Sequence, residues 1–122
     1  MLAGLGAITC AMDGDIGQVA RAAGGIDFVQ ALLAEVLTAI GAAWRPLSDS
    51  LKSQTVSLLT DRSSTLTSSM YRDMKAGQRI EADQIIGDLV SRAAAHGIAT
   101  PLLSAVLLRL KVYEQARAAG AP

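Results

Sequence analysis

The chain has 122 residues, a length that suits one domain, and we treat residues 1–122 as a single unit. Its residues are 51% hydrophobic and 18% charged, a balance that indicates a globular fold and excludes a disordered chain. Lys and Arg together number 11, as do Asp and Glu, so no net positive charge favours a nucleic-acid partner.

The chain opens on an apolar segment, from Met1 to Met12, with helical spacing. No basic residue precedes the apolar run, and the run is too short to cross a bilayer. We therefore interpret it as a helix of the protein core and expect no membrane partner. A polar stretch with several glycines follows, in which the run from Gly14 to Gly17 reads as a turn and not as a nucleotide cradle.

A long helix is predicted next, with Asp27 as its candidate N-cap. Pro46 should end it, because the residue before a proline is pushed out of the helical region. Two sets of side chains fit its buried face, and the pattern leaves both open: Phe28, Leu32, Val36 and Ile40, or Leu33 and Leu37.

Ser48 is the candidate N-cap of a third helix, whose apolar residues are Leu51, Val56, Leu58 and Leu59. The polar cluster at residues 61–64 indicates a break. A fourth helix is predicted from about Thr65 to Lys75. It should stop at Gly77, since glycine readily adopts the left-handed conformation that closes a helix.

A fifth helix is predicted from about Ala82 to His96, closed by Gly97. Thr100 followed by Pro101 predicts the start of the last helix, with a hydroxyl cap and a proline at the first helical position. This helix carries Leu103, Val106, Leu107, Leu110 and Tyr113, and we expect residues 116–122 to fray. The sequence therefore predicts an all-α fold, a compact bundle of about six helices without a sheet.

Few residues of the chain suit catalysis or metal binding. Cys10 and His96 are its only cysteine and histidine, so the usual tetrahedral zinc ligands cannot be assembled and we expect no metal site. A single cysteine fits a reducing compartment, which favours a cytoplasmic protein. His96 stands directly before Gly97 at a predicted helix end, where the helix dipole favours a cation, and we interpret it in that structural role.

The most informative stretch covers residues 67–83. It combines a hydroxyl-rich helix start, a glycine-ended turn and a carboxylate placed just before the next helix. Ser68 or Ser69 can donate to an anionic or carbonyl ligand, and Glu81 can accept from a ligand hydroxyl. On spacing alone, the same residues fit ordinary helix caps better than a ligand site.

A set of motifs along the chain favours the ligand site over ordinary helix caps. The parts of this signature are Ser68-Ser69-Met70, Asp73, Ala76-Gly77, Glu81 and Asp83 followed by Gly87, and then Gly97-Ile98-Ala99-Thr100-Pro101. In this order they resemble the carboxy-terminal domain of the ketopantoate reductase family. The turn at Gly14 also lies where that domain has one, so the resemblance covers nearly the whole chain.

The resemblance implies a helical, substrate-side domain similar to the carboxy-terminal domain of 6-phosphogluconate-dehydrogenase-like enzymes. The family reduces the small 2-oxo acid ketopantoate to pantoate with NADPH, a step of pantothenate biosynthesis. Carried over to this chain, Ser69 contacts the substrate and Glu81 hydrogen-bonds in the same pocket. The family's catalytic lysine falls upstream of Met1, so we expect no catalytic residue in this chain.

The chain also departs from the family pattern. Leu66 and Ile86 stand where the family has asparagines, and a polar position of the first helix falls near Ala3. A pocket that loses such hydrogen-bonding groups discriminates less between ligands, so the 2-oxo acid is left open. The Rossmann domain that positions NADPH in the complete family enzyme is missing, and we expect this chain alone to bind no cofactor.

Two hypotheses about function follow. In the first, the chain is the substrate-side half of a reductase, inactive alone, and a Rossmann-domain partner supplies NADPH and the lysine. In the second, it is a non-catalytic helical module for assembly or binding. We expect a homo-oligomer, because an orphaned domain exposes an apolar patch. An independent enzyme is disfavoured, since the chain offers no nucleophile–base pair or metal set.

Overall fold

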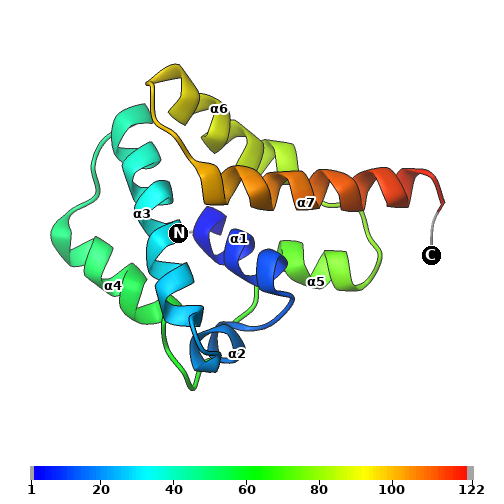
Figure 1. The fold of residues 1–122 in the computed structure, drawn as a ribbon, viewed down its shortest axis with the longest axis horizontal. Helices are drawn as coiled ribbons and strands as arrows, with labels where there is room; N and C mark the ends of the chain where they lie inside the picture. The colour runs from blue at the N-terminus through cyan, green and yellow to red at the C-terminus, as the bar shows by residue number, and fades with distance from the viewer. Residues whose placement is uncertain (1, 121–122) are drawn as a thin grey trace.

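The computed structural model describes residues 2–120, which fold entirely as helices and connecting loops, with no strand among them (Figure 1). The predicted all-α fold is therefore confirmed. In chain order the described elements are α1 (Leu2–Met12), α2 (Ile16–Arg21), α3 (Gly25–Ala43), α4 (Asp49–Leu59), α5 (Ser69–Lys75), the π-helical segment η1 (Asp83–Gly87), α6 (Asp88–Ala95) and α7 (Pro101–Ala118).

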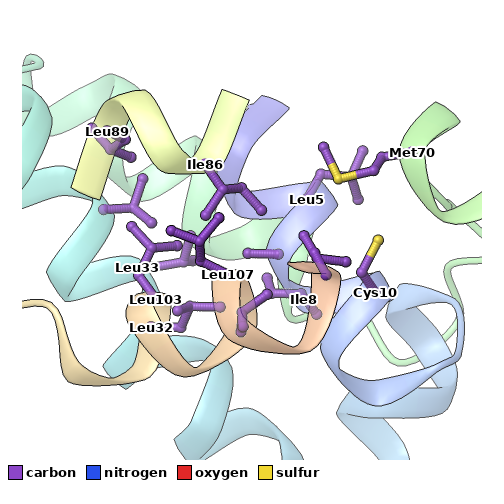
Figure 2. Close-up of a cluster of buried hydrophobic side chains, with 14 of the residues drawn as sticks. Leu5, Ile8, Cys10, Leu32, Leu33, Met70, Ile86, Leu89, Leu103 and Leu107 are labelled. Carbon is purple, nitrogen blue, oxygen red and sulfur yellow. The ribbon is translucent and has the colours of Figure 1, made fainter. Parts of the chain in front are cut away.

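Helix α1 lies at the centre of the fold, where it contacts α2, α3, α5, α7 and η1. Cys10 and Ile8 of this helix have no exposed surface. Figure 2 shows Leu5 and Ile8 among side chains from α3, η1 and α7, which include Leu32, Leu33, Ile86, Leu103 and Leu107. The apolar start of the chain is thus a core helix, as predicted; Met1 itself lies outside the described residues.

Helix α2 is the element that the sequence did not predict. The run expected to be a turn instead begins a helix at Asp15, whose carboxylate accepts from the backbone N–H of Gln18 while the Gln18 side chain accepts from the N–H of Asp15. This reciprocal capping box satisfies two backbone donors that a short helix leaves unpaired. Gly17 lies within the helix, so its role is not to make a turn.

Helix α3 begins earlier than predicted. Its N-cap is Gly24, at a φ of +82°, and Asp27 lies in the first helical turn. The start of α3 packs closely onto α2, because a Cβ atom built on Gly25 would lie 1.7 Å from the carbonyl oxygen of Val19. Only glycine allows that contact at the first turn.

Both predicted faces of α3 contribute to its interior side. The fully buried residues are Val29, Leu32, Leu33, Val36 and Ala39, whereas Phe28, Leu37 and Ile40 are partly exposed. The helix ends at Ala43, before Pro46 as expected. Helix α3 is long and apolar enough by length and composition to cross a membrane. In this fold it packs against α1, α2, α4, α6 and α7, as a core helix does.

The Ser48 cap of α4 is confirmed, with Ser48 Oγ accepting from the backbone N–H of Leu51 at 3.1 Å. Of the four apolar residues assigned to this helix, only Leu59 is fully buried, and Leu51 and Leu58 are exposed. The predicted break at residues 61–64 is confirmed. Helix α5 then starts at Ser69, later than predicted, because Ser68 supplies the cap.

The fifth predicted helix corresponds to η1 and α6 together, which run without a break up to Ala95. Gly77 and Gly97 both have a φ of +73°, so the predicted closing glycines are confirmed after α5 and α6. The last helix starts at Pro101 as predicted and continues through Ala118, so the fraying expected from residue 116 is wrong for 116–118. Residues 121–122 lie outside the described residues.

The cap of α7 differs from the prediction. Thr100 makes no side-chain cap; its hydroxyl instead lies 3.2 Å from Ser104 Oγ. The Glu35 carboxylate of α3 takes that place, with Oε2 and Oε1 accepting from the backbone N–H groups of Leu102 and Leu103 at 3.0 and 2.9 Å. A carboxylate at a helix start satisfies free N–H groups and complements the helix dipole.

Candidate functional site

The first serine of the signature, Ser68, has a structural role. Ser68 Oγ accepts from the backbone N–H of Tyr71 at 3.0 Å and lies 2.8 Å from Thr9 Oγ1. The Thr9 hydroxyl already donates to the carbonyl of Leu5 at 2.8 Å, so Ser68 is the donor to Thr9. Both hydroxyls are buried and fully used, and the pair joins α5 to α1.

Ser69 is placed differently. It is the first residue of α5, it is exposed, and its hydroxyl forms no hydrogen bond with the described residues. The two neighbouring serines thus separate into one hydroxyl that holds the fold and one that faces outward. Spacing alone could not distinguish them, because an N-cap and the first helical residue are adjacent.

Glu81 is exposed between two buried neighbours, Ile80 and Ala82. It follows the turn that links α5 to η1, which Figure 1 shows beside the second half of α7. Burial of the flanking residues fixes the backbone while the carboxylate remains free. Ser69 and Glu81 form no hydrogen bond with each other, and both are exposed, Ser69 at the start of α5 and Glu81 on the segment that connects α5 with η1.

The loop before α5 is held by the helix that the sequence missed. The backbone N–H of Gly17 donates to the carbonyl of Ser64 at 2.8 Å, and that of Ile16 donates to the carbonyl of Leu66 at 3.0 Å. A Cβ atom on Gly17 would lie 2.3 Å from the Ser64 oxygen. Gly17 therefore permits a close backbone approach that sets where the Ser68–Ser69 pair begins.

One ion pair lies at the end of α5. Lys75 Nζ lies 3.0 Å from Asp13 Oδ1, and its hydrogen bond to Asp13 lowers the pKa of the Asp13 carboxyl. The same contact raises the pKa of Lys75. Asp13 has a φ of +52°, a left-handed conformation that aspartate tolerates better than most residues. The ion pair joins the end of α1 to the end of α5.

Cys10 lies in the core, and His96 lies at a helix end. Burial raises the pKa of the Cys10 thiol to about 11, although the charge of Arg109 acts to lower it. A thiol with that pKa is a poor nucleophile near neutral pH. His96 is the exposed C-cap of α6, the helix end at which it was predicted.

The described residues contain no Rossmann-type dinucleotide fold. That fold needs a strand followed by a glycine-rich turn at a helix start, and residues 2–120 contain no strand. Several surface hollows are present among the described residues, and two of them lie near the segments discussed above. One, of about 400 Å³, is lined by Met12, Val19 and Phe28 among others, and the other, of about 320 Å³, lies between residues 79–84 and α7. Neither Ser69 nor Glu81 lines either hollow.

The described residues form an all-α bundle with an outward-facing serine and glutamate and with no strand in residues 2–120, and this fold matches the helical carboxy-terminal domain of 6-phosphogluconate-dehydrogenase-like enzymes. The chain belongs to the family described as "Ketopantoate reductase PanE/ApbA C terminal", whose sequence model matches residues 1–114. The family predicted from the signature is thereby confirmed.

Solved structures share the fold. The dimeric ketopantoate reductase of Staphylococcus aureus superposes with a TM-score of 0.80 at 22% identity, over 95% of this chain and 41% of that one. The ketopantoate reductase from Ralstonia eutropha JMP134 gives 0.80 at 20% identity, over 94% and 38%. D-mandelate dehydrogenase, solved with NADH and anilino(oxo)acetate, gives 0.76 at 16% identity, over 94% and 38%.

A curated relative is also similar in sequence. The uncharacterized oxidoreductase YkpB of Bacillus subtilis (strain 168) is 30% identical over 107 residues, which cover 88% of this chain and 35% of the relative. The chain thus spans about a third of the length of this relative and a similar share of the superposed reductases.

Proposed function

We propose that this chain is the substrate-side domain of a reductase that uses NADPH to reduce a 2-oxo acid, such as ketopantoate, to the 2-hydroxy acid. Ser69 would contact the substrate and Glu81 would accept from a substrate hydroxyl in the same pocket. One observation carries the assignment: Ser68 is fully hydrogen-bonded and buried, which leaves Ser69 as the outward-facing hydroxyl of the signature.

The proposal divides the reaction between two parts of an enzyme. NADPH supplies the hydride when bound, and a nucleotide-binding domain would hold it against the substrate. A lysine upstream of Met1 would give the proton to the substrate carbonyl oxygen. This chain would bind and orient the 2-oxo acid and, without the other part, would have no activity. We place the enzyme in the cytoplasm, in keeping with the buried free thiol of Cys10.

The family positions that differ in this chain bear on the substrate. Ile86 is fully buried in the core, so a ligand cannot reach it. Leu66 is 37% exposed, and Ala3 is partly buried in the first turns of α1. A pocket wall that includes Leu66 and Ala3 would be less polar than the family pattern. We therefore propose that 2-oxo acids with apolar side chains are accepted alongside ketopantoate.

Binding of ketopantoate to the isotope-labelled chain, followed by NMR, tests the site. We expect the amide signals of Ser69 and Glu81 to shift, and Ser69→Ala to weaken binding. Ser57→Ala, at an exposed serine of α4, is the matched control and should leave binding unchanged. Absence of any shift at residues 68–83 would refute the assignment of these residues.

Activity is tested by co-expressing the chain with a nucleotide-binding domain that carries the lysine, and by following NADPH oxidation across several 2-oxo acids. We expect turnover only when both parts are present. Turnover of ketopantoate by the chain alone would contradict the proposed division of the reaction.

A second function, a non-catalytic module that self-associates, is favoured by one specific observation. Leu108 and Val112 are 63% and 57% exposed, and their i, i+4 spacing puts them on one outer stripe of α7. The opposite side of the same helix is buried in the core, through Leu103 and Leu110. We propose a homo-oligomer that buries this stripe. Light scattering of the chain and of Leu108→Glu tests it: a monomer in both would exclude association through α7.

A further inference from the structure

The turn at residues 76–80 is held by consecutive residues of α7. Tyr113 Oη donates to the carbonyl oxygen of Gln78 at 2.6 Å. Glu114 Oε1 accepts from the backbone N–H of Ile80 at 3.0 Å. These contacts cross more than thirty residues of sequence, so α7 holds the turn in addition to the local hydrogen bond from the Gln78 N–H to the Asp73 carbonyl.

A third residue of α7, Arg117, also holds the turn, and we call Tyr113, Glu114 and Arg117 together the clamp. Arg117 Nε donates to the carbonyl oxygen of Gly77 at 3.2 Å. Beyond the turn, Ile80 and Ala82 are buried while Glu81 between them is exposed. The backbone on the N-terminal side of Glu81 is therefore fixed by hydrogen bonds, and both neighbours are fixed by burial. The restrained backbone fixes the point at which the Glu81 side chain leaves the surface.

We propose that Tyr113 and Glu114 are positioning residues for the Glu81 carboxylate. The inference rests on the proposed function, in which Glu81 accepts from a substrate hydroxyl. Tyr113 and Glu114 do not touch the substrate; they keep the turn in the conformation that aims Glu81 at it. Loss of either contact frees the turn, and a displacement of about 1 Å is enough to weaken an oriented contact markedly.

Three variants test the clamp without removing α7. Tyr113→Phe keeps the ring and removes only the hydroxyl. Glu114→Ala removes the acceptor of the Ile80 N–H and keeps α7 intact, because alanine favours the helix. Glu114→Gln keeps an oxygen that can accept from the same N–H and serves as the rescue. Gln115→Ala is the control, because the Gln115 side chain makes no hydrogen bond with the described residues.

The readout is the affinity for two ligands, measured by NMR titration of the labelled chain. The ligands are ketopantoate and 3,3-dimethyl-2-oxobutanoate, which differ by one hydroxyl. We expect Tyr113→Phe and Glu114→Ala to weaken ketopantoate binding roughly tenfold, the scale of one oriented polar contact, and to leave the other ligand nearly unchanged. Glu114→Gln and Gln115→Ala should behave as the unmodified chain.

Two results would overturn the positioning role. One is equal weakening for both ligands, as general loosening of the fold would produce; the other is unchanged affinity in Glu114→Ala. If the unmodified chain binds neither ligand, the proposed function fails and the positioning role fails with it. Amide exchange at Ile80 separates the two failures, because it reports the contact with Glu114 without any ligand. If the contact exists, the Ile80 N–H is protected in the unmodified chain and exchanges faster in Glu114→Ala.

Discussion

Thr9 and Ser68, 59 positions apart in the sequence, form a hydrogen bond in the core, with their hydroxyl oxygens 2.8 Å apart. Ser68 donates to Thr9, Thr9 donates to the carbonyl of Leu5, and Ser68 accepts from the N–H of Tyr71. Each hydroxyl proton has one acceptor, so the pair is complete without water. It fixes the start of α5, and with it Ser69, against the central helix.

Replacing Thr9 by valine preserves the shape of the side chain and removes the acceptor of the Ser68 hydroxyl. Because a buried donor without a partner costs about 1–3 kcal/mol, Thr9→Val should lower the free energy of unfolding by that amount. Urea unfolding followed by circular dichroism measures it. Thr38→Val, at an exposed position of α3, should change the free energy by less than about 0.5 kcal/mol. Equal effects at both positions would contradict the buried pair.

Gly25→Ala should prevent normal packing of α3 on α2. Its Cβ atom would lie 1.7 Å from the carbonyl oxygen of Val19, so the backbone of one helix must move. We expect a loss of more than about 3 kcal/mol or failure to fold, a size that marks core disruption. Gly24→Ala is the comparison, since nothing lies within 4 Å of that Cβ atom and only the left-handed φ is penalised, by about 1–2 kcal/mol.

Glu35→Ala should loosen the start of α7. The change removes both acceptors of the Leu102 and Leu103 N–H groups, and loss of a helix cap costs about 0.5–2 kcal/mol. Hydrogen exchange should show faster exchange at these two amides and little change at the end of α7. Gln30→Ala, on the exposed side of α3, is the matched control. Unchanged protection at Leu102 and Leu103 in Glu35→Ala would show that another group caps the helix.

The Asp13–Lys75 pair gives a dependence on pH with a definite sign. Its hydrogen bond to Lys75 holds the pKa of Asp13 below the usual value of 3.8. The stabilisation is therefore present above pH 3.8 and is lost as the pH falls through the lowered pKa of the folded state. In Lys75→Gln the carboxyl titration of Asp13, followed by carbon NMR, should move up toward 3.8. Since both side chains are half exposed, we expect almost no change in stability at neutral pH.

Signals that act within one turn of chain were readable from the sequence. Ser48 caps α4, Gly77 and Gly97 close α5 and α6, and Pro101 starts α7, all as predicted. Each depends on a residue's own conformational preference or on a hydrogen bond to a backbone group three residues away. The family and the all-α fold were also readable, because the signature from Ser68 to Pro101 is contiguous and specific.

Features that depend on distant partners were not readable. Gly17 was interpreted as a turn because its close approach to the Ser64 carbonyl is set by the fold. The local pattern favours Thr100 as the cap of α7, whereas the actual cap is Glu35, 67 positions before Leu102, the residue whose N–H donates to it. At the candidate site, Ser69 and Glu81 were reached through the family resemblance, whereas the contacts of Tyr113 with the turn appear only in three dimensions.

The cap that Glu35 provides also couples residues 35 and 100 in the evolution of the chain. Thr100 leaves the start of α7 without a local acceptor. A change of Glu35 to a residue without an acceptor therefore leaves the helix start uncapped, unless residue 100 changes to a side chain that caps. The two positions should therefore covary: a relative without an acid at the first should carry aspartate, asparagine or serine at the second. Glu35→Ala combined with Thr100→Asp would recreate that exchange in one step and restore most of what the single change removes.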